Sequence, residues 1–272
     1  MQTNWSQFRF TPRHKSRNLF ENVLSPATVG GIDLHWSFTA GNFVNSSPAV
    51  SNGVVYVGSH DHNVYALNGS TGAKLWSFAT GDFVFSSPAV ANGVVYVGSF
   101  DDNVYALNAS TGAKLWSFTT GNVLDSSPAV ANGVVYVGSA DGNVYALNAS
   151  TGALLWSFAT GSDVESSPAV ANGVVYVGSD DKNVYALNAS TGALLWSFTT
   201  GSFVFSSPAV ANGVVYVGSE DEKVYAFDQT GGALARTTRT AQRRPDPKTL
   251  RPNFNLKMSK PVATLPRNGS GD

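Results

Sequence analysis

Residues 86–125 read SSPAVANGVVYVGSFDDNVYALNASTGAKLWSFTTGNVLD, and closely similar stretches of 40 residues stand on both sides of them. A fixed period of this length indicates a repeat architecture, in which each repeat is one unit of supersecondary structure. The pentapeptide that opens each repeat, SSPAV, begins at Ser46, Ser86, Ser126, Ser166 and Ser206.

Each repeat contains four short apolar segments separated by turn-forming residues. In the quoted stretch, Asn92-Gly93 predicts a tight hairpin turn because both residues tolerate positive φ, and polar turns follow at 100–103 and 109–112. The intervening segments are rich in Val, Tyr, Phe and Trp, which is typical of β-strands. The segment 94–97 is apolar throughout, which indicates a sheet covered on both faces. Four-stranded antiparallel units stacked in this way predict a β-propeller.

The two ends of the repeat array each carry part of a repeat. Residues 206–229 supply three segments of a fifth unit, but Arg236 stands where the tryptophan of the fourth segment is due. Residues 32–39, IDLHWSFT, have the sequence of a fourth segment without the other three. We therefore predict an all-β fold, a β-propeller of five four-stranded antiparallel blades closed by an N-terminal strand, 32–39, that pairs with the last repeat.

The composition excludes several classes of site. The 272 residues include no cysteine, so no disulfide, thiolate metal site or Fe–S cluster can form. Hydrophobic residues make up 43% of the chain, which is enough for a packed core. Only 13% of the residues are charged, which argues against the broad basic face of a nucleic-acid binder. We also expect no membrane span, because no apolar run is long enough.

The distribution of charge divides the chain into three parts. Residues 32–234, the predicted propeller, hold 15 Asp and Glu but only 4 Lys and Arg. The lead-in segment 1–31 is polar and basic, and we expect no secretory signal in it because it lacks an apolar segment. Residues 235–272 are basic, rich in proline and without apolar periodicity. We expect this tail to be disordered.

The turn before the fourth segment carries a family resemblance. The stretch 65–76, YALNGSTGAKLW, resembles the tryptophan-docking motif of the PQQ-like (quinoprotein-type) β-propeller repeat family, and it recurs at 105–116, 145–156 and 185–196. The resemblance implies a propeller in which the repeated tryptophan packs between adjacent blades, and it suggests an extracytoplasmic setting. The structural docking residues that it implies are Trp36, Trp76, Trp116, Trp156 and Trp196.

The resemblance also raises the question of a cofactor. Dehydrogenases of this family use a calcium-bound quinone, but no non-repeated cluster of acidic and amide residues stands in this sequence for such a site. We therefore expect no cofactor, no metal and no enzymatic activity, with PQQ and calcium as the alternative. The pair His60 and His62 is interpreted as turn residues and not as metal ligands.

One aspartate recurs in the second turn of every repeat. We interpret it as the residue of an Asx turn, and a ring of five calcium sites is the alternative. The Asx turn is favoured because only one carboxylate per turn recurs, whereas calcium takes six to eight oxygen ligands. The recurring residues are Asp61, Asp101, Asp141, Asp181 and Asp221.

The repeats differ from one another mainly in two loops, the one before SSPAV and the one flanking the recurrent aspartate. In an up-and-down antiparallel blade these loops lie on the same side of the molecule. Exposed phenylalanines on the loops of a rigid scaffold are typical of a binding site. The candidate binding face consists of Phe43, Asn45, His60, His62, Phe83, Phe85, Phe100, Asp102, Asp125, Asp180, Lys182, Phe203, Phe205, Glu220 and Glu222.

The sequence therefore predicts a non-enzymatic scaffold that binds a protein or a small polar ligand through one variable loop face. The alternatives are a multivalent lectin-like carbohydrate binder and a quinone-dependent oxidoreductase. We expect no nucleic-acid partner, and either a monomer or a strand-swapped homo-oligomer. The compartment stays open, because the resemblance and the N-terminal segment point in different directions.

Overall fold

The computed structural model describes residues 24–229, all of which belong to the first of two units of the chain, Met1–Thr230. These residues form five antiparallel sheets with almost no helix, and each sheet is built from consecutive strands. We call the sheets blades 1 to 5 in chain order. The predicted all-β architecture with five repeated units is confirmed. The predicted tail, 235–272, and most of the predicted lead-in segment lie outside the described residues.

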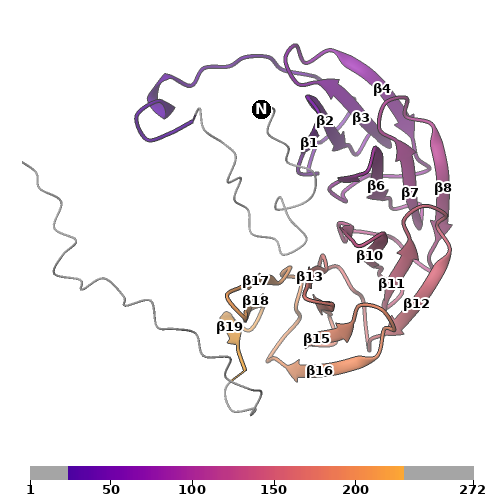
Figure 1. Ribbon diagram of the computed structural model, residues 1–272, viewed down its shortest axis with the longest axis vertical. Coiled ribbons are helices and arrows are strands. Elements are labelled where there is room, and N and C mark those ends of the chain that lie inside the picture. Colours follow the sequence, from indigo (N-terminus) through magenta and orange to yellow (C-terminus); the bar gives the residue numbers. More distant parts are fainter. Residues whose placement is uncertain (1–23, 230–272) are drawn as a thin grey trace, which may run out of the picture. The chain divides into compact units, whose positions relative to one another are not determined.

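The strands of each blade follow one another from the inner side of the array to its outer side (Figure 1). Blade 1 consists of β1 (Ala49–Ser51), β2 (Val54–Gly58), β3 (Asn63–Asn68) and β4 (Lys74–Ala79). Blade 2 consists of β5 (Ala89–Ala91), β6 (Val94–Gly98), β7 (Asn103–Asn108) and β8 (Lys114–Thr119). Blade 3 consists of β9 (Ala129–Ala131), β10 (Val134–Gly138), β11 (Asn143–Asn148) and β12 (Leu154–Ala159). Blade 4 consists of β13 (Ala169–Ala171), β14 (Val174–Gly178), β15 (Asn183–Asn188) and β16 (Leu194–Thr199). Blade 5 consists of β17 (Ala209–Ala211), β18 (Val214–Ser219) and β19 (Lys223–Phe227).

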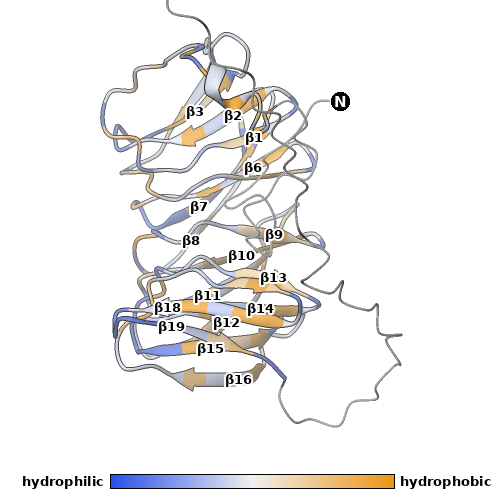
Figure 2. Cartoon of the chain, turned by 90° about the vertical axis from the view of Figure 1, so that its left-hand side faces the viewer, coloured by the Kyte–Doolittle hydropathy of each residue, from blue (hydrophilic) through white to orange (hydrophobic). Residues whose placement is uncertain are grey.

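Hydropathy follows the strands. Figure 2 shows apolar residues concentrated in the strands and polar residues in the connecting loops. The one helical element of residues 24–229 is the short 3₁₀ turn η1 (Val29–Gly31). Within that range, no helix has the length and apolar character needed to cross a membrane.

The hairpin between the first two strands of a blade adopts the predicted turn. In blade 2, Asn92 has φ 50° and Gly93 has φ 77°, so both central residues lie in the left-handed region. This conformation matches the twist of the flanking strands, which explains why Asn-Gly recurs at this point. The register that follows pairs Val94 with Ala91 and Tyr96 with Ala89.

The hydrophobic core lies between the blades. One cluster combines Tyr56, Val64 and Ala66 of blade 1 with Val84 and Val97 of the next repeat. All five side chains are buried. Equivalent clusters join blade 2 to blade 3 and blade 3 to blade 4. Each sheet is therefore covered by a neighbouring sheet, which explains the continuously apolar middle strands.

The repeated tryptophan docks one blade onto the next. Trp116 of β8 is 9% exposed, and its indole Nε1 donates a hydrogen bond of 3.0 Å to the Ala149 carbonyl oxygen of blade 3. Tyr96 donates its hydroxyl to the same oxygen. The indole ring lies against Gly152, which has φ +73° and no side chain. Trp36, Trp76 and Trp156 make the same bond to residues 69, 109 and 189.

A second connection between blades runs along the inner strands. The backbone N–H of Ser87 donates to Ser127 Oγ at 2.9 Å, and that of Ser127 donates to Ser167 Oγ at 2.9 Å. Ser47 and Ser167 continue the series with bonds to Ser87 and Ser207. Each bond links residues 40 positions apart, so the second serine of SSPAV ties every blade to the one after it.

The recurrent aspartate fixes the second turn. In blade 3, Asp141 Oδ1 accepts the Asn143 N–H at 2.9 Å, while Oδ2 accepts the Gly121 N–H and the Tyr145 hydroxyl. Burial alone would raise the pKa of Asp141, but the hydrogen bonds from Tyr145, Gly121 and Asn143 hold it below its usual value. Both carboxylate oxygens are thus occupied by the protein itself. The Asx turn explains this residue, and the structure gives no support to a ring of calcium sites.

The predicted pairing of residues 32–39 with the last repeat is not observed. These residues form no strand in the described structure, and blade 5 has three strands. The segment instead lies against blade 1, where Trp36 and Phe38 pack with Tyr65 and Leu67. Trp36 docks onto Gly69 and Gly72 of blade 1, as Trp76, Trp116 and Trp156 dock onto the repeat that follows each of them. The docking part of the prediction is therefore observed for this segment, whereas its pairing with β19 is not.

Candidate functional site

The two variable loops of each repeat are hydrogen-bonded to each other. The N–H of His60 donates to the Phe43 carbonyl oxygen at 2.9 Å, and that of Asp180 donates to the Asp163 carbonyl oxygen at 2.9 Å. Blades 2, 3 and 5 have equivalent bonds. The two loops are therefore joined within each repeat, and we call the five pairs of loops together the variable loop face. It consists of residues 42–45, 82–85, 122–125, 162–165 and 202–205 with 60–62, 100–102, 140–142, 180–182 and 220–222.

Six of the predicted site residues form one aromatic cluster at blades 1 and 2. Its centre is His60, whose ring centroid lies 3.8 Å from that of Phe85 and 5.2 Å from that of Phe83. Phe85 in turn stacks on Phe100 at 4.6 Å. The members of the aromatic cluster are Phe43, His60, His62, Phe83, Phe85 and Phe100.

His60 occupies an unusual position for a turn residue. It is only 7% exposed, and its Nε2 atom is buried without a hydrogen-bond partner. At position 100 the next repeat has phenylalanine, which makes a similar stack without a polar atom. A buried polar atom without a partner costs free energy, so packing against the phenylalanines outweighs that cost here.

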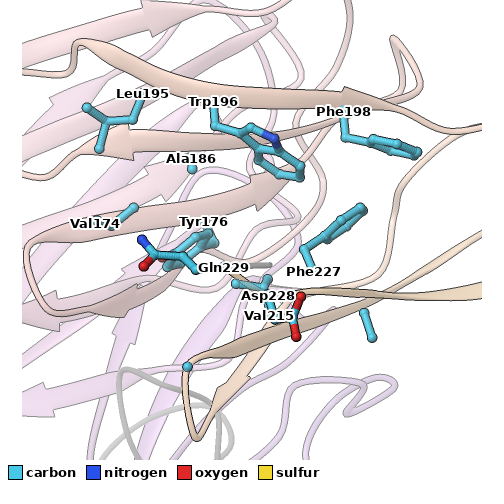
Figure 3. Close-up of a pocket in the computed structure, with 12 residues that line it drawn as sticks. Val174, Tyr176, Ala186, Leu195, Trp196, Phe198, Val215, Phe227, Asp228 and Gln229 are labelled. Carbon is cyan, nitrogen blue, oxygen red and sulfur yellow. The ribbon is translucent and has the colours of Figure 1, made fainter. Parts of the chain in front are cut away.

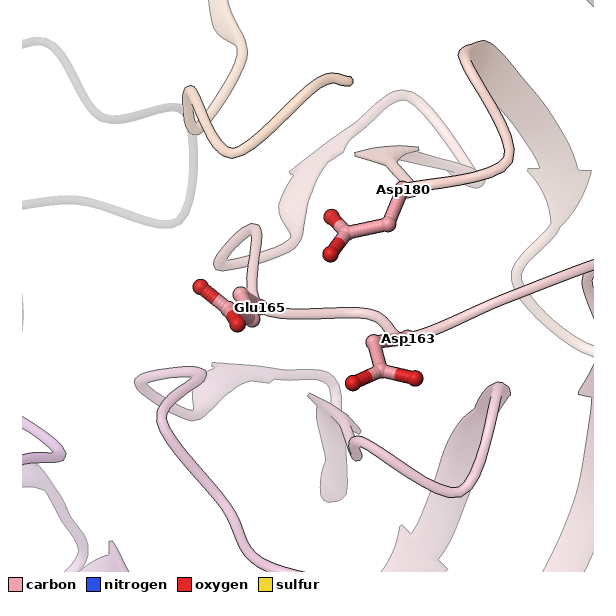
Figure 4. Close-up of side chains that lie close together, drawn as sticks. All are labelled: Asp163, Glu165 and Asp180. Atoms are coloured by element: carbon pink, nitrogen blue, oxygen red, sulfur yellow. The ribbon is translucent and has the colours of Figure 1, made fainter.

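Three carboxylates form an acidic cluster in the loops that lead into and through blade 4. One oxygen from each of Asp163, Glu165 and Asp180 lies within 4.8 Å of the others. Figure 4 shows the three side chains lying close together on neighbouring loops. Val164 is fully buried between Asp163 and Glu165, so the two acidic side chains fall on the same side of the chain.

The proximity of these carboxylates perturbs their titration. Burial, followed by the charges of Asp125, Asp180, Asp163 and Glu220, raises the pKa of Glu165 to about 7. Burial and the neighbouring charges of Asp163, Glu220 and Asp181 raise the pKa of Asp180 to about 6. Like charges held this close destabilise one another, so the cluster favours a bound cation or a proton.

Asp125 connects the aromatic cluster to the acidic cluster. Burial raises the pKa of Asp125, and the charge of His60 acts in the opposite direction. The same carboxylate contributes to the raised pKa of Glu165. Asp125 is therefore close enough to interact electrostatically with both clusters. The variable loop face thus has an aromatic part and an acidic part, and Asp125 interacts electrostatically with one residue of each.

Replacing Glu165 with Gln should stabilise the protein at alkaline pH. The pKa of Glu165 is about 7 in the folded chain and 4.5 ordinarily. Between pH 4.5 and pH 7, the folded chain therefore keeps a proton that the unfolded chain has lost. Stability therefore falls as pH rises through this window. Glu165→Gln should raise Tm at pH 8 by ~2–4 °C, about 1 kcal/mol after allowance for solvent screening, and leave it unchanged at pH 4.

The measurement is thermal unfolding of both proteins from pH 4 to pH 8. Glu222→Gln is the matched control, since Glu222 is exposed on blade 5 and is not a member of the acidic cluster. An equal Tm gain from both variants, or a gain that does not depend on pH, would contradict the assigned cause.

The remaining predicted residues lie on the variable loop face without joining either cluster. Phe203 and Phe205 form a separate pair, with ring centroids 5.8 Å apart. Asn45 and Glu220 are exposed. Three others occupy the turn position that Gly142 takes in blade 3, and they have positive φ, as does His62 of the aromatic cluster at the same position. They are Asp102, Lys182 and Glu222.

Two residues of the acidic cluster, Asp163 and Glu165, are absent from the sequence-based candidate set. Both lie in the variable loop 162–165, so the difference between repeats was a signal that marked them. Their significance depends on their proximity to Asp180, which lies in a different loop. That proximity follows from the backbone bond between Asp180 and Asp163 and is not visible in either loop alone.

A separate cleft of about 620 Å³ lies between blades 4 and 5 (Figure 3). Its walls include Trp196, Phe198 and Phe227, and none of its lining residues belongs to the variable loop face. Trp196 is 37% exposed in this cleft, whereas Trp116 and Trp156 at the same repeat position are 9% and 8% exposed.

The fold has clear relatives among known proteins. A family model described as outer membrane protein assembly factor BamB matches residues 33–157 and 161–259. The quinohemoprotein alcohol dehydrogenase from Comamonas testosteroni is 19% identical with a TM-score of 0.72, and the match covers 85% of this chain and 48% of that chain. The corresponding enzyme from Pseudomonas putida HK5 is 21% identical with a TM-score of 0.69, covering 83% and 46%. BamB from Moraxella catarrhalis is 21% identical with a TM-score of 0.52, covering 74% and 76%.

These likenesses define the fold and leave the activity open. This chain spans about half the length of the two dehydrogenases that it matches. No curated protein matches the sequence. The family model, however, matches well over half of the chain, in agreement with the repeated docking motif and the stacked four-stranded sheets. The chain therefore belongs to the PQQ-like β-propeller repeat family, whose matching model carries the description outer membrane protein assembly factor BamB.

Proposed function

We propose that this protein is a non-enzymatic binding scaffold whose variable loop face takes a basic segment of a partner protein that also carries an aromatic or apolar side chain. The observation that carries the proposal is that the variable loops hold both the aromatic cluster and the acidic cluster, and that Asp125 interacts electrostatically with His60 of the first and Glu165 of the second. The family contains an outer membrane assembly factor, so a binding role is compatible with the fold. By the same resemblance, we propose an extracytoplasmic setting.

The acidic part supports a cationic partner. The carboxylates of Asp163, Glu165 and Asp180 repel one another, and a lysine or arginine side chain placed among them removes that repulsion. Arginine suits such a site best, because its planar guanidinium donates to two carboxylates at once. The net negative charge of residues 32–234 steers a basic segment toward the protein.

The aromatic part supports an apolar or aromatic anchor beside the cation. Phe43 is 73% exposed and lies at the edge of the aromatic cluster, 6.0 Å from the His60 ring. Exposed aromatic rings of this kind bury large areas on binding and also interact with guanidinium groups. A partner segment that alternates basic and aromatic residues therefore matches both parts.

Backbone strain on the variable loop face supports a role in binding for the side chains at the strained positions. His62, Asp102 and Lys182 hold positive φ at a position where blade 3 has Gly142. A residue with a side chain costs about 1 kcal/mol more than glycine in this region. Side chains kept at such a cost are frequent at binding sites.

The test uses a peptide of alternating arginine and phenylalanine, titrated into the full chain by isothermal titration calorimetry at pH 7.5. We expect binding that weakens at least 5-fold in Asp163→Asn and in Phe85→Ala, since each removes a contact worth about 1 kcal/mol or more. Binding should also weaken as the salt concentration rises and as pH falls from 7.5 to 5.5.

Two controls make this test specific. Asp33→Asn removes a carboxylate that lies outside the variable loop face, and it should leave the affinity unchanged. A peptide of alternating glutamate and phenylalanine should not bind. Equal binding of both peptides, or equal losses in Asp33→Asn and Asp163→Asn, would refute the proposed charge recognition.

A quinone-dependent oxidoreductase is the second candidate, and the acidic cluster is the observation in its favour. Asp163, Glu165 and Asp180 offer oxygen ligands, which suit a hard cation such as Ca²⁺ in their chemistry. Calcium would supply the charge that orients a bound quinone. A Tm gain with calcium and PQQ together, accompanied by reduction of an electron-accepting dye, would favour this candidate. A Tm gain with simple sugars would instead favour the lectin-like alternative.

A further inference from the structure

The two ends of the repeat array expose apolar side chains whose counterparts in the other repeats are buried. At the N-terminal end, Val44 is 48% exposed, whereas Val84, Leu124, Val164 and Val204 at the same repeat position are fully buried. Each of those four packs against the blade that precedes it in the chain. Among residues 24–229, no blade precedes Val44 in the chain.

The C-terminal end shows the complementary feature. Val224 of β19 is 79% exposed, whereas its counterparts Val64, Val104, Val144 and Val184 are fully buried. In blades 1 to 4, this position is covered by the next blade and by the fourth strand, as Val104 is opposite Phe118. Blade 5 has neither cover among the described residues.

The internal interfaces show how the two ends would fit. Val84 of the second repeat packs onto Gly58 of blade 1 so closely that a Cβ at Gly58 would overlap it. Val204 packs in the same way onto Gly178. At Gly218, the matching position of blade 5, the only contact of such a Cβ within 4 Å is Ser206 of the same blade. Gly218 and Val224 therefore form a receptor site that fits a valine in the position of Val44.

The N-terminal segment also has the sequence of the strand that blade 5 lacks. Residues 34–38, LHWSF, align with the first five residues of outer strands such as β8, KLWSFT. The register of β7 and β8 pairs Tyr105 with Ser117, so the same register would pair Tyr225 with Ser37. The outer edge of β19 has no strand partner among the described residues, and an unpaired edge is a template for another strand.

We propose that residues 32–44 of a second copy of this chain bind the open side of blade 5, so that copies associate head to tail. The side chain of Val44 then enters the site at Gly218 and Val224, and residues 32–39 add a fourth strand to β19. A second copy is the occupant because within one chain Val44 and Val224 are both exposed and so do not meet. Such an interface is heterologous, and it extends to rings or filaments.

The test uses two single variants, each of which blocks one end. Val44→Glu removes the inserting side chain, and Val224→Glu removes the receptor site. Both positions are exposed within one chain, so each variant should keep the Tm of the isolated protomer. By analytical ultracentrifugation, the unmodified chain should form oligomers as its concentration rises, and each variant alone should stay monomeric.

Mixing the two variants gives the decisive result. Val44→Glu retains an intact blade 5 and Val224→Glu retains an intact N-terminal segment, so an equimolar mixture should form a dimer and nothing larger. Leu115→Glu, at a 51% exposed position of blade 2, is the control and should not change the oligomeric state. A chain that is monomeric at every concentration, with Tm lowered by both end variants, would instead establish closure within one copy and overturn the proposal. Oligomers that resist both variants would overturn it as well.

Discussion

Replacing Trp116 with Ala should lower the free energy of unfolding by about 3–5 kcal/mol, the range for removing a buried aromatic side chain. The ring is 9% exposed, lies against Gly152 of the next blade and donates a hydrogen bond to Ala149. Its removal leaves a cavity between blades 2 and 3 and removes one of two donors from the Ala149 carbonyl oxygen. The measurement is equilibrium urea unfolding followed by circular dichroism, because a repeat protein unfolds through its interfaces.

Trp196→Ala provides the matched control for this prediction. Trp196 occupies the same position in blade 4 but is 37% exposed, and its indole N–H has no hydrogen-bond partner among the described residues. We expect a loss below about 1.5 kcal/mol, since less apolar area is buried there. Equal losses in the two variants would show that docking between blades is not what makes the tryptophan stabilising.

Replacing Gly152 with Ala should cost about 2–4 kcal/mol. A Cβ at this position would lie 2.7 Å from Cδ2 of Trp116, so the indole ring would have to move out of its docked position. The residue also has φ +73°, a conformation that costs alanine about 1 kcal/mol relative to glycine. The same urea unfolding experiment measures the effect, and the near-ultraviolet signal of the tryptophans should change with it.

Gly133→Ala separates the two contributions. Gly133 has φ +76°, but no atom lies within 4 Å of a Cβ placed there. We expect a loss of about 1 kcal/mol from the backbone alone. If Gly133→Ala were as destabilising as Gly152→Ala, the contact with Trp116 would carry no stability, and the docking account would be wrong.

The repeat made most of the fold predictable. Asn92-Gly93 determines a hairpin because few other residue pairs accept positive φ at both positions. Asp141 could be assigned to an Asx turn from its recurrence, and the structure adds that its second oxygen holds Gly121 and Tyr145. Such local features repeat in every blade, so the sequence presents the same evidence several times.

The ends of the array were less predictable, for a physical reason. Whether residues 32–39 pair with β19 depends on the small rotation between successive blades, which no single repeat encodes. The sequence shows that a fourth strand is missing from one end and left over at the other. The docking motif predicts that Trp36 packs on blade 1, but this contact does not determine whether residues 32–39 also pair with β19.

The candidate site was predictable in its location and only partly in its composition. Phenylalanines in the loops were expected on one face, and the structure gathers those of blades 1 and 2 around His60. The burial of His60 and the approach of Glu165 to Asp180 arise from contacts between different loops. Such contacts depend on how neighbouring side chains fill the space between the loops. Variation between the repeat sequences does not show how that space is filled.

The most direct test of the proposed binding role is hydrogen exchange mass spectrometry of the full chain with a saturating concentration of the arginine–phenylalanine peptide. We predict slower exchange in the loops 41–45, 81–85, 121–125 and 161–165, with no change in the Asn-Gly turns on the opposite side. Protection confined to those turns or to the cleft at Trp196, or no binding of the peptide at millimolar concentration, would contradict the account.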